Sequence, residues 1–187
     1  MNATPILILI AVAVLIVAGL VTLLAIRKGR SQKLREKFGP EYDYTMEKVG
    51  DRRAAEETLE EREKRINKLA IRVLDSNEWD HFHAKWVDIQ ANFVDEPTES
   101  VEEANRLIKE VMVARGFPVA DFEQRVADIS VMVPNFVSNY RNAHAIALKS
   151  QRNEVTTEEL RQAMVYYRSL FDELLETEET KVKEETV

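Results

Sequence analysis

Histidine side chains are the first candidates for chemistry, because imidazole titrates near neutral pH and is a common metal ligand. The chain has three of them. His81 and His83 are two residues apart, so on a helix they point about 200° from each other and do not share a metal easily. His144 lies beside an apolar stripe, one helical turn after Tyr140. We expect a core histidine held by a backbone or carboxylate partner. The alternative is a site between helices that uses His144, Tyr140 and a facing carboxylate.

Other sequence patterns that could indicate catalysis, metal binding or phosphate binding are weak or missing. Cysteine is absent, which removes disulfides, thiolate nucleophiles and cysteine-based zinc sites. No serine stands in a Gly-x-Ser-x-Gly context, and no glycine-rich loop is present to hold a phosphate. Asp121, Glu123 and Asp128 are expected on the solvated face of a helix, and Trp79 and Trp86 in the core. The sequence therefore predicts no catalytic residue, no cofactor and no metal, and it favours a protein that is not an enzyme.

The N-terminal region contains a long apolar run. Pro5 to Ile26 spans 22 residues without a charge. A helix of that length is ~33 Å long, enough to cross a hydrocarbon core of ~30 Å. The four residues before it carry no side-chain charge, and no Ala-x-Ala site follows it, so a cleaved secretory signal is disfavoured. We predict a transmembrane helix over residues 5–26.

Basic residues near this run predict its orientation. Six of them follow the run within a short stretch and none precedes it: Arg27, Lys28, Arg30, Lys33, Arg35 and Lys37. An excess of Lys and Arg stays on the cytoplasmic side. We therefore expect the N-terminus to face outward and the C-terminal part to lie in the cytoplasm. Contact of the same residues with anionic lipid headgroups is a second interpretation.

Residues 27–68 are expected to form a basic juxtamembrane segment and a charged helical stalk. Gly39-Pro40 should break the first helix, since proline cannot continue one. Asp51 is placed to cap the next helix. That helix has only a thin apolar stripe, with Arg62 where a core residue would be expected. Such a polar helix is typical of a solvent-bridging stalk.

Residues 69–175 show the pattern of a helical bundle domain. Asp75 to Glu78 and Thr156 to Glu159 have the spacing of capping boxes. Gly116 fits the end of a helix, and Pro134 should break another. We predict about five helices of roughly four turns in a compact antiparallel bundle, an all-α fold. The acidic residues 176–187 are predicted to be a disordered tail.

Charge is divided unevenly along the chain. Residues 27–68 hold 13 basic and 10 acidic side chains, a net charge of +3. Residues 69–187 hold 13 basic and 23 acidic side chains, a net charge of −10. An acidic domain repels nucleic-acid phosphates and anionic lipid. Nucleic acid is therefore excluded as a partner of the bundle.

Several sequence segments are similar to those of a known family. They are REKFGPEYD at 35–43, GDRRAAE at 50–56, RGFPVADFEQRVADIS at 115–130, NYRNAHAIA at 139–147 and TEELRQAMVYYRSLFDELL at 157–175. As a set they resemble a family of bacterial proteins described only as hypothetical or membrane proteins. The resemblance covers nearly all of the chain after the apolar run. It implies a bacterial inner-membrane setting and carries over no functional residues.

These observations favour a membrane-anchored cytoplasmic helical module that serves interaction or scaffolding. Its expected partners are the lipid bilayer and either another protein or a second copy of the chain. A small-ligand binder or an enzyme with a site between bundle helices is the alternative function. A general role in stress or envelope maintenance is a third possibility.

Overall fold

The computed structural model describes residues 3–118, 120–152 and 154–175, except for the side chains of residues 3–14, 23, 24, 26 and 27. Its elements are α1 (Ala3–Phe38), α2 (Pro40–Val49), α3 (Arg52–Ile66), α4 (Ser76–Asn92), α5 (Pro97–Ala114), α6 (Phe122–Ile129), the 3-10 turn η1 (Pro134–Phe136), α7 (Val137–Ser150) and α8 (Thr157–Leu174). No strand occurs within these ranges. The predicted all-α fold is confirmed.

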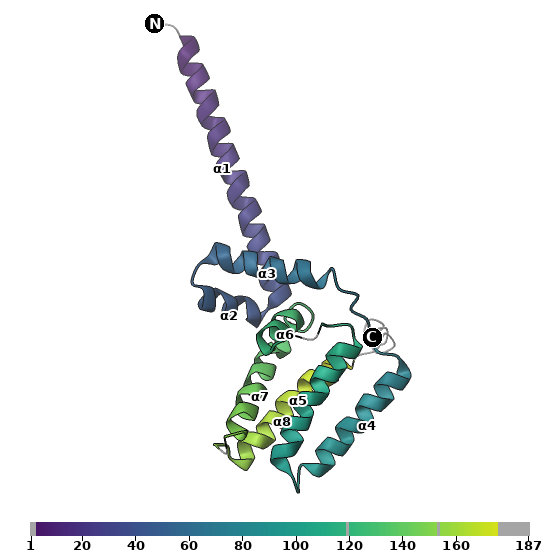
Figure 1. Ribbon diagram of the computed structural model, residues 1–187. Helices are drawn as coiled ribbons and strands as arrows, with labels where there is room; N and C mark the ends of the chain where they lie inside the picture. The colour runs from purple at the N-terminus through teal and green to yellow at the C-terminus, as the bar shows by residue number, and fades with distance from the viewer. Residues whose placement is uncertain (1–2, 119, 153, 176–187) are drawn as a thin grey trace, which may run out of the picture.

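Helix α1 runs without a break for 36 residues and projects away from the rest of the molecule (Figure 1). Gly39 ends it with a φ of 47°, and Pro40 begins α2. Glycine adopts such a left-handed conformation at little cost, and proline suits the first position of a helix. The predicted break at Gly39-Pro40 is confirmed. Among the residues whose side chains the structure describes, which leave out more than half of the run at 5–26, no helix has an apolar stretch long enough to cross a membrane.

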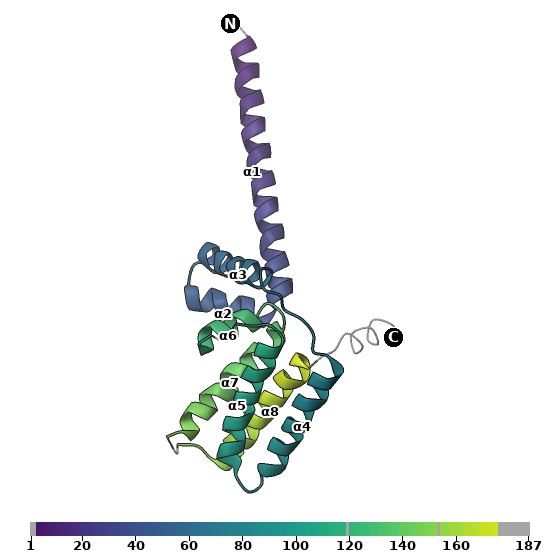
Figure 2. The ribbon, with the colours of Figure 1, turned by 45° about the vertical axis from the view of Figure 1, so that its right-hand side comes forward.

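Residues 27–68 differ from the expected stalk. Helices α2 and α3 fold back against the last turns of α1 (Figures 1 and 2). Leu34, Phe38, Tyr42 and Leu59 form a small core between the three helices. The hydroxyl groups of Ser31 and Tyr42 donate to Glu56 at 2.5 and 2.9 Å. Because the thin apolar stripe of α3 is matched by α1 and α2, these segments make a folded unit rather than a solvent-bridging helix.

The bundle consists of α4, α5, α7 and α8, with α6 across the end that faces α2 and α3 (Figure 2). Helix α8 packs against both α5 and α7, and α4 packs against α5. The core includes fully buried aromatic and aliphatic side chains, among them Ile108, Tyr140, Tyr167 and Phe171. The predicted bundle is confirmed, although its third helix is short. Helix α6 ends at Ile129 rather than just before Pro134, and Val133, with a φ of −131° and a ψ of 57°, is no longer helical.

Predicted caps begin three of the helices. Asp51 accepts a hydrogen bond from the Ala54 amide, and both capping boxes are formed, at Asp75 and at Thr156. Arg72 donates to both carboxylate oxygens of Glu78 at 2.6 Å and helps to lower the pKa of Glu78 to about 2. These local contacts fix where α3, α4 and α8 start.

The linker between α3 and α4 passes close to the end of α5. The Arg72 amide donates to the Arg115 carbonyl at 2.9 Å. Gly116 has a φ of 96°, and a Cβ there would lie 2.6 Å from the Ala70 carbonyl oxygen. Glycine is therefore required at position 116 for two reasons, its backbone angle and this close approach.

Candidate functional site

An ion network joins the α1–α3 unit to the bundle. The Glu41 side chain, on α2, is 1% exposed and accepts from Arg62 of α3 at 2.8 Å. Arg141 of α7 donates to both Glu41 oxygens, at 2.6 and 2.8 Å. The guanidinium of Arg141 also lies 3.8 Å from the centre of the Tyr44 ring. A bidentate arginine–carboxylate pair fixes orientation as well as distance. The network therefore holds the α1–α3 unit and the bundle in one relative orientation.

A second buried carboxylate lies beside this network. Asp128 of α6 is 1% exposed, and it accepts from Arg65 at 2.9 Å and from Gln124 at 2.7 Å. The expectation that Asp128 lies on a solvated face is therefore wrong. Arg62 donates in addition to the Ser130 hydroxyl at 3.2 Å. Arg62, which interrupts the apolar stripe of α3, and Arg65 thus both contact α6 of the bundle or the residue that ends it, and the sequence pattern missed this role.

His144 and Tyr140, the predicted pocket candidates, lie together in an aromatic cluster on α6 and α7. The His144 ring stacks on Phe122 with 3.7 Å between ring centres. Tyr140 is fully buried, and its hydroxyl accepts from Nε of Arg125 at 3.1 Å. The side chain that contacts the Tyr140 hydroxyl is thus a cation, where the alternative interpretation expected a carboxylate. Nδ1 of His144 is buried without a hydrogen-bond partner among the described residues, so the expected backbone or carboxylate partner is not found at this atom.

The cluster is electropositive. Burial lowers the pKa of His144, and the nearby charges of Arg125 and Lys109 lower it further, while Glu123 acts in the opposite direction. Burial, followed by Arg125 and Arg106, lowers the pKa of the Lys109 ammonium. Neighbouring positive charge disfavours the protonated form of both groups. The local potential therefore favours a neutral imidazole at His144.

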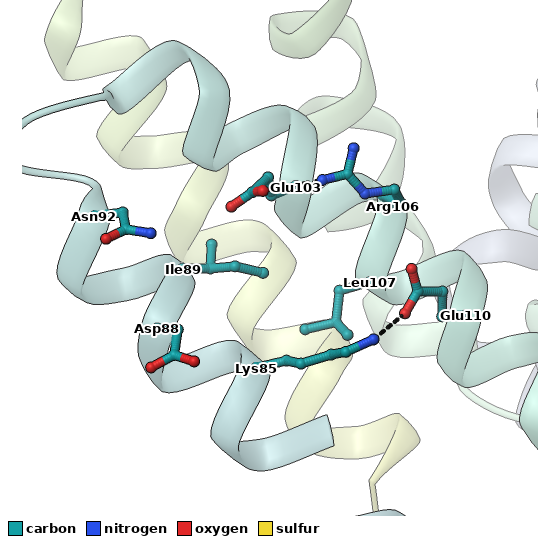
Figure 3. Close-up of a pocket in the computed structure, with 8 residues that line it drawn as sticks. All are labelled: Lys85, Asp88, Ile89, Asn92, Glu103, Arg106, Leu107 and Glu110. Carbon is teal, nitrogen blue, oxygen red and sulfur yellow. Dashed lines mark hydrogen bonds and ion pairs between the residues drawn. The ribbon is translucent and has the colours of Figure 1, made fainter. Parts of the chain in front are cut away.

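A groove separates α4 from α5 (Figure 3). It contains a hollow of about 290 Å³ lined by both helices. Lys85 reaches across it from α4 to Glu110 of α5, with 2.8 Å between Nζ and the carboxylate oxygen (Figure 3). Ile89 and Leu107 form the apolar floor between the charged rims. The groove thus combines a small apolar floor with charged rims.

The groove continues toward the turn between α4 and α5. A second hollow of about 370 Å³ is lined by Asn92, Asp95, Glu96, Glu99, Ser100 and Glu103. Asn92 and Glu103 line both hollows. Lys85 and Arg106 are paired with Glu110 and Glu103, whereas the other carboxylates of the groove form no ion pair within the described part of the chain; these are Asp88, Asp95, Glu96 and Glu99. The groove therefore carries unneutralised negative charge.

The remaining candidates do not converge on a site. His81 and His83 are exposed on α4, and His83 stacks on Trp79 with 4.6 Å between ring centres. Trp86 is buried and stacks on Phe171 at 4.9 Å, as its predicted core position requires. In the described ranges, no three His, Cys, Asp or Glu side chains are placed to hold a metal ion.

Several of the basic residues after the apolar run contact acidic residues of α2 and α3. Arg30 pairs with Glu60, Arg35 with Asp43 at 2.8 Å, and Lys37 with Glu63 at 2.6 Å. Lys28 and Lys33 form no ion pair within the described residues, and the Arg27 side chain lies outside them. The folded unit therefore neutralises about half of the basic cluster.

No family description, curated protein or solved structure matches this chain.

Proposed function

We propose that the chain is a single-pass protein of the bacterial inner membrane that holds a helical protein-interaction module at the cytoplasmic surface. The main support for this proposal is that α1 belongs to two parts of the molecule. Its first part contains the uncharged run from Pro5 to Ile26. Its last turns place Leu34 and Phe38 in the core of the α1–α3 unit. One helix thus serves as both the anchor and part of the module.

The exposed surface of α1 supports the anchor. Leu15, Ile16 and Leu20 are 58–72% exposed, and the helix extends away from the other helices (Figure 2). Contiguous apolar surface of this kind is uncommon in soluble proteins and marks contact with a partner or a membrane. A lipid bilayer is the partner that suits an uncharged helix on all its sides. The basic residues that follow give the orientation, with the bundle in the cytoplasm.

The groove between α4 and α5 supports the interaction role. The turn between these helices lies at the end of the bundle opposite α1 (Figure 1). With α1 in a bilayer, this acidic end faces the cytoplasm, away from anionic lipid. Complementary charge speeds encounter and selects partners, so the partner should present a segment rich in Lys and Arg.

Fusion reporters test the anchor and its orientation. A reporter that functions only in the cytoplasm, fused after Val187, should be active, and one that functions only in the periplasm should be inactive. The full chain should also remain in the membrane fraction after an alkaline carbonate wash. Release by that wash would contradict the anchor, and activity of the periplasmic reporter would contradict the orientation.

Peptide binding tests the groove separately. The probe is a fluorescent peptide of alternating lysine and alanine, added to the full chain in uncharged detergent. The triple variant D95N/E96Q/E99Q should bind it about tenfold more weakly, because three unpaired carboxylates are lost. The control E47Q/E57Q/E61Q removes the same charge from exposed positions of α2 and α3 and should retain the affinity. Equal weakening in both variants would show that only the net charge of the chain matters. It would overturn the proposal that the groove binds the peptide.

A further inference from the structure

Lys85 crosses the groove between α4 and α5 instead of lying along its own helix. Its side chain extends to Glu110, with 2.8 Å between Nζ and the carboxylate oxygen (Figure 3). On the way it passes Leu107, which lines the same hollow and is 2% exposed (Figure 3). A lysine stem packs on apolar side chains of this kind while its ammonium stays at a charged rim. Lys85 therefore occupies the part of the groove where a ligand would lie.

The pair of Lys85 with Glu110 is only partly shielded from water. The two side chains are 42% and 41% exposed. Ion pairs at such exposure contribute little to stability, so the crossing lysine is not what holds α4 against α5. The apolar core does that, and Ile89 and Leu107 both belong to it. Lys85 can thus change its partner without loosening the bundle.

A second carboxylate lies within reach of the same ammonium. Asp88 follows Lys85 by three residues on α4, lines the same hollow and forms no ion pair in the described part of the chain. Side chains three apart on a helix are neighbours, with about 5–6 Å between their Cβ atoms, and opposite charges at this spacing attract. Rotation of the Lys85 side chain would therefore exchange Glu110 for Asp88. The groove would then be open, and Glu110 would have no counter-charge.

We infer that Lys85 is a gate over the groove and that a lysine of the bound partner replaces it. In the closed state the Lys85 ammonium pairs with Glu110. In the open state it pairs with Asp88, and the partner's lysine places its stem over Leu107 and its ammonium at Glu110. An ammonium on an apolar stem is the group that this position already accepts from the protein itself. The inference rests on the proposed function, because it names the group that the basic segment inserts and the contact that regulates its entry.

The acidic end of the groove favours this exchange. The second hollow adjoins the first and is lined by three carboxylates without an ion pair in the described ranges, those of Asp95, Glu96 and Glu99. A segment with several lysines meets these charges as well as Glu110, whereas Lys85 offers a single ammonium. Complementary charge along the segment therefore outweighs the one contact that the gate gives up.

Peptide affinity tests the gate in the full chain in uncharged detergent. The fluorescent peptide of alternating lysine and alanine should bind K85Q about fivefold more tightly than the unaltered chain, because no closed state remains to reduce the apparent affinity. R106Q is the matched control. Arg106 lines the same hollow but pairs with Glu103 of its own helix at 3.0 Å, so its loss should tighten binding less than about twofold. D88N should weaken binding more in the chain with Lys85 than in K85Q, since only the former uses Asp88 in its open state.

A small ligand tests the alkylammonium site without a polypeptide. K85A removes the lysine stem and leaves Glu110 without its counter-charge. n-Butylammonium has the length and the charge of the lost side chain, so it should raise the thermal unfolding midpoint of K85A in a saturable way. It should not do so in the unaltered chain or in K85A/E110Q. Tetramethylammonium, which has the charge without the stem, should have no effect on K85A. Circular dichroism measures the midpoints.

The two tests separate this inference from the proposed function. If n-butylammonium stabilises K85A while the peptide binds neither the unaltered chain nor K85Q, the polypeptide partner is wrong and the alkylammonium site is supported. If the peptide binds but K85Q and R106Q have the same affinity, the interaction role is retained and the gate is overturned. Absence of a saturable effect of n-butylammonium on K85A, or an equal effect on K85A/E110Q, would overturn the site at Glu110.

Discussion

Glu41 and Arg141 are 100 residues apart in the chain and meet through two parallel hydrogen bonds of 2.6 and 2.8 Å. Arg62 contacts the same carboxylate from α3, so one buried side chain connects α2, α3 and α7. Each of the two arginine side chains is less than one-fifth exposed. The charge of Glu41 therefore contributes to the position of the α1–α3 unit on the bundle, together with the pair of Arg65 with Asp128.

Replacing Glu41 by Gln should destabilise the protein by about 3 kcal/mol, since two partly buried arginines would lose their counter-charge. The measurement is the free energy of unfolding by denaturant in uncharged detergent. D43N is the control, because the exposed pair of Asp43 with Arg35 should contribute less than about 1 kcal/mol. Equal losses in the two variants would contradict the special role of Glu41.

Two buried tyrosines should respond oppositely to loss of the hydroxyl. The Tyr167 hydroxyl is buried without a hydrogen-bond partner in the described structure, so Y167F should be neutral or stabilising. The Tyr140 hydroxyl accepts from Arg125, so Y140F should cost about 1–2 kcal/mol. Thermal unfolding followed by circular dichroism compares the two. A larger loss in Y167F than in Y140F would contradict this assignment.

Glycine replacements separate backbone strain from close contact. G50A should cost about 1 kcal/mol, because φ is +75° but no atom lies within 4 Å of the new Cβ. G116A should cost more than about 2 kcal/mol, since its Cβ would also meet the Ala70 carbonyl oxygen. Denaturant midpoints report the order, and G116A as stable as G50A would rule out the close contact.

Stability should depend on pH through His144. Burial and the charges of Arg125 and Lys109 lower the pKa of His144 in the folded chain, with Glu123 opposing them. Below about pH 6.5 the unfolded chain then binds more protons than the folded chain, so stability falls as the pH drops through this range. H144Q should reduce this fall, and H83Q should not. Unfolding free energies at neutral and mildly acidic pH make the comparison, and an unchanged slope in H144Q would refute it.

Local features of the fold were predictable because their causes lie within a few residues. Gly39-Pro40 ended α1, Asp51 capped α3, and the boxes at Asp75 and Thr156 began α4 and α8, as their spacing predicted. Trp86 entered the core for the same kind of reason, since helical periodicity identifies a buried face. Short-range chemistry was sufficient in each case.

Long-range pairing was not predictable in this way. Arg62 appeared as a defect in an apolar stripe, and Asp128 as one more solvated acid. Each acquires its role from a partner more than 20 residues away, Arg62 from Glu41 and Asp128 from Arg65. The cationic surroundings of His144 likewise come from α5 and α6, and helical spacing along α7 does not reveal them. Such contacts depend on how the helices are arranged, which the pattern of a single segment does not specify.

The continuity of α1 into a packed core has a mechanical consequence. Phe38, at its last residue, is fully buried, and the turn that follows is one residue long. No flexible linker therefore separates the outer part of α1 from the α1–α3 unit. A twist applied to α1 would pass as torque through α2 and α3 to Glu41, and from there to α7. A shortened chain that begins at Gly39 would lack Leu34 and Phe38. It would therefore expose the apolar side chains of Tyr42 and Leu59 that pack against them.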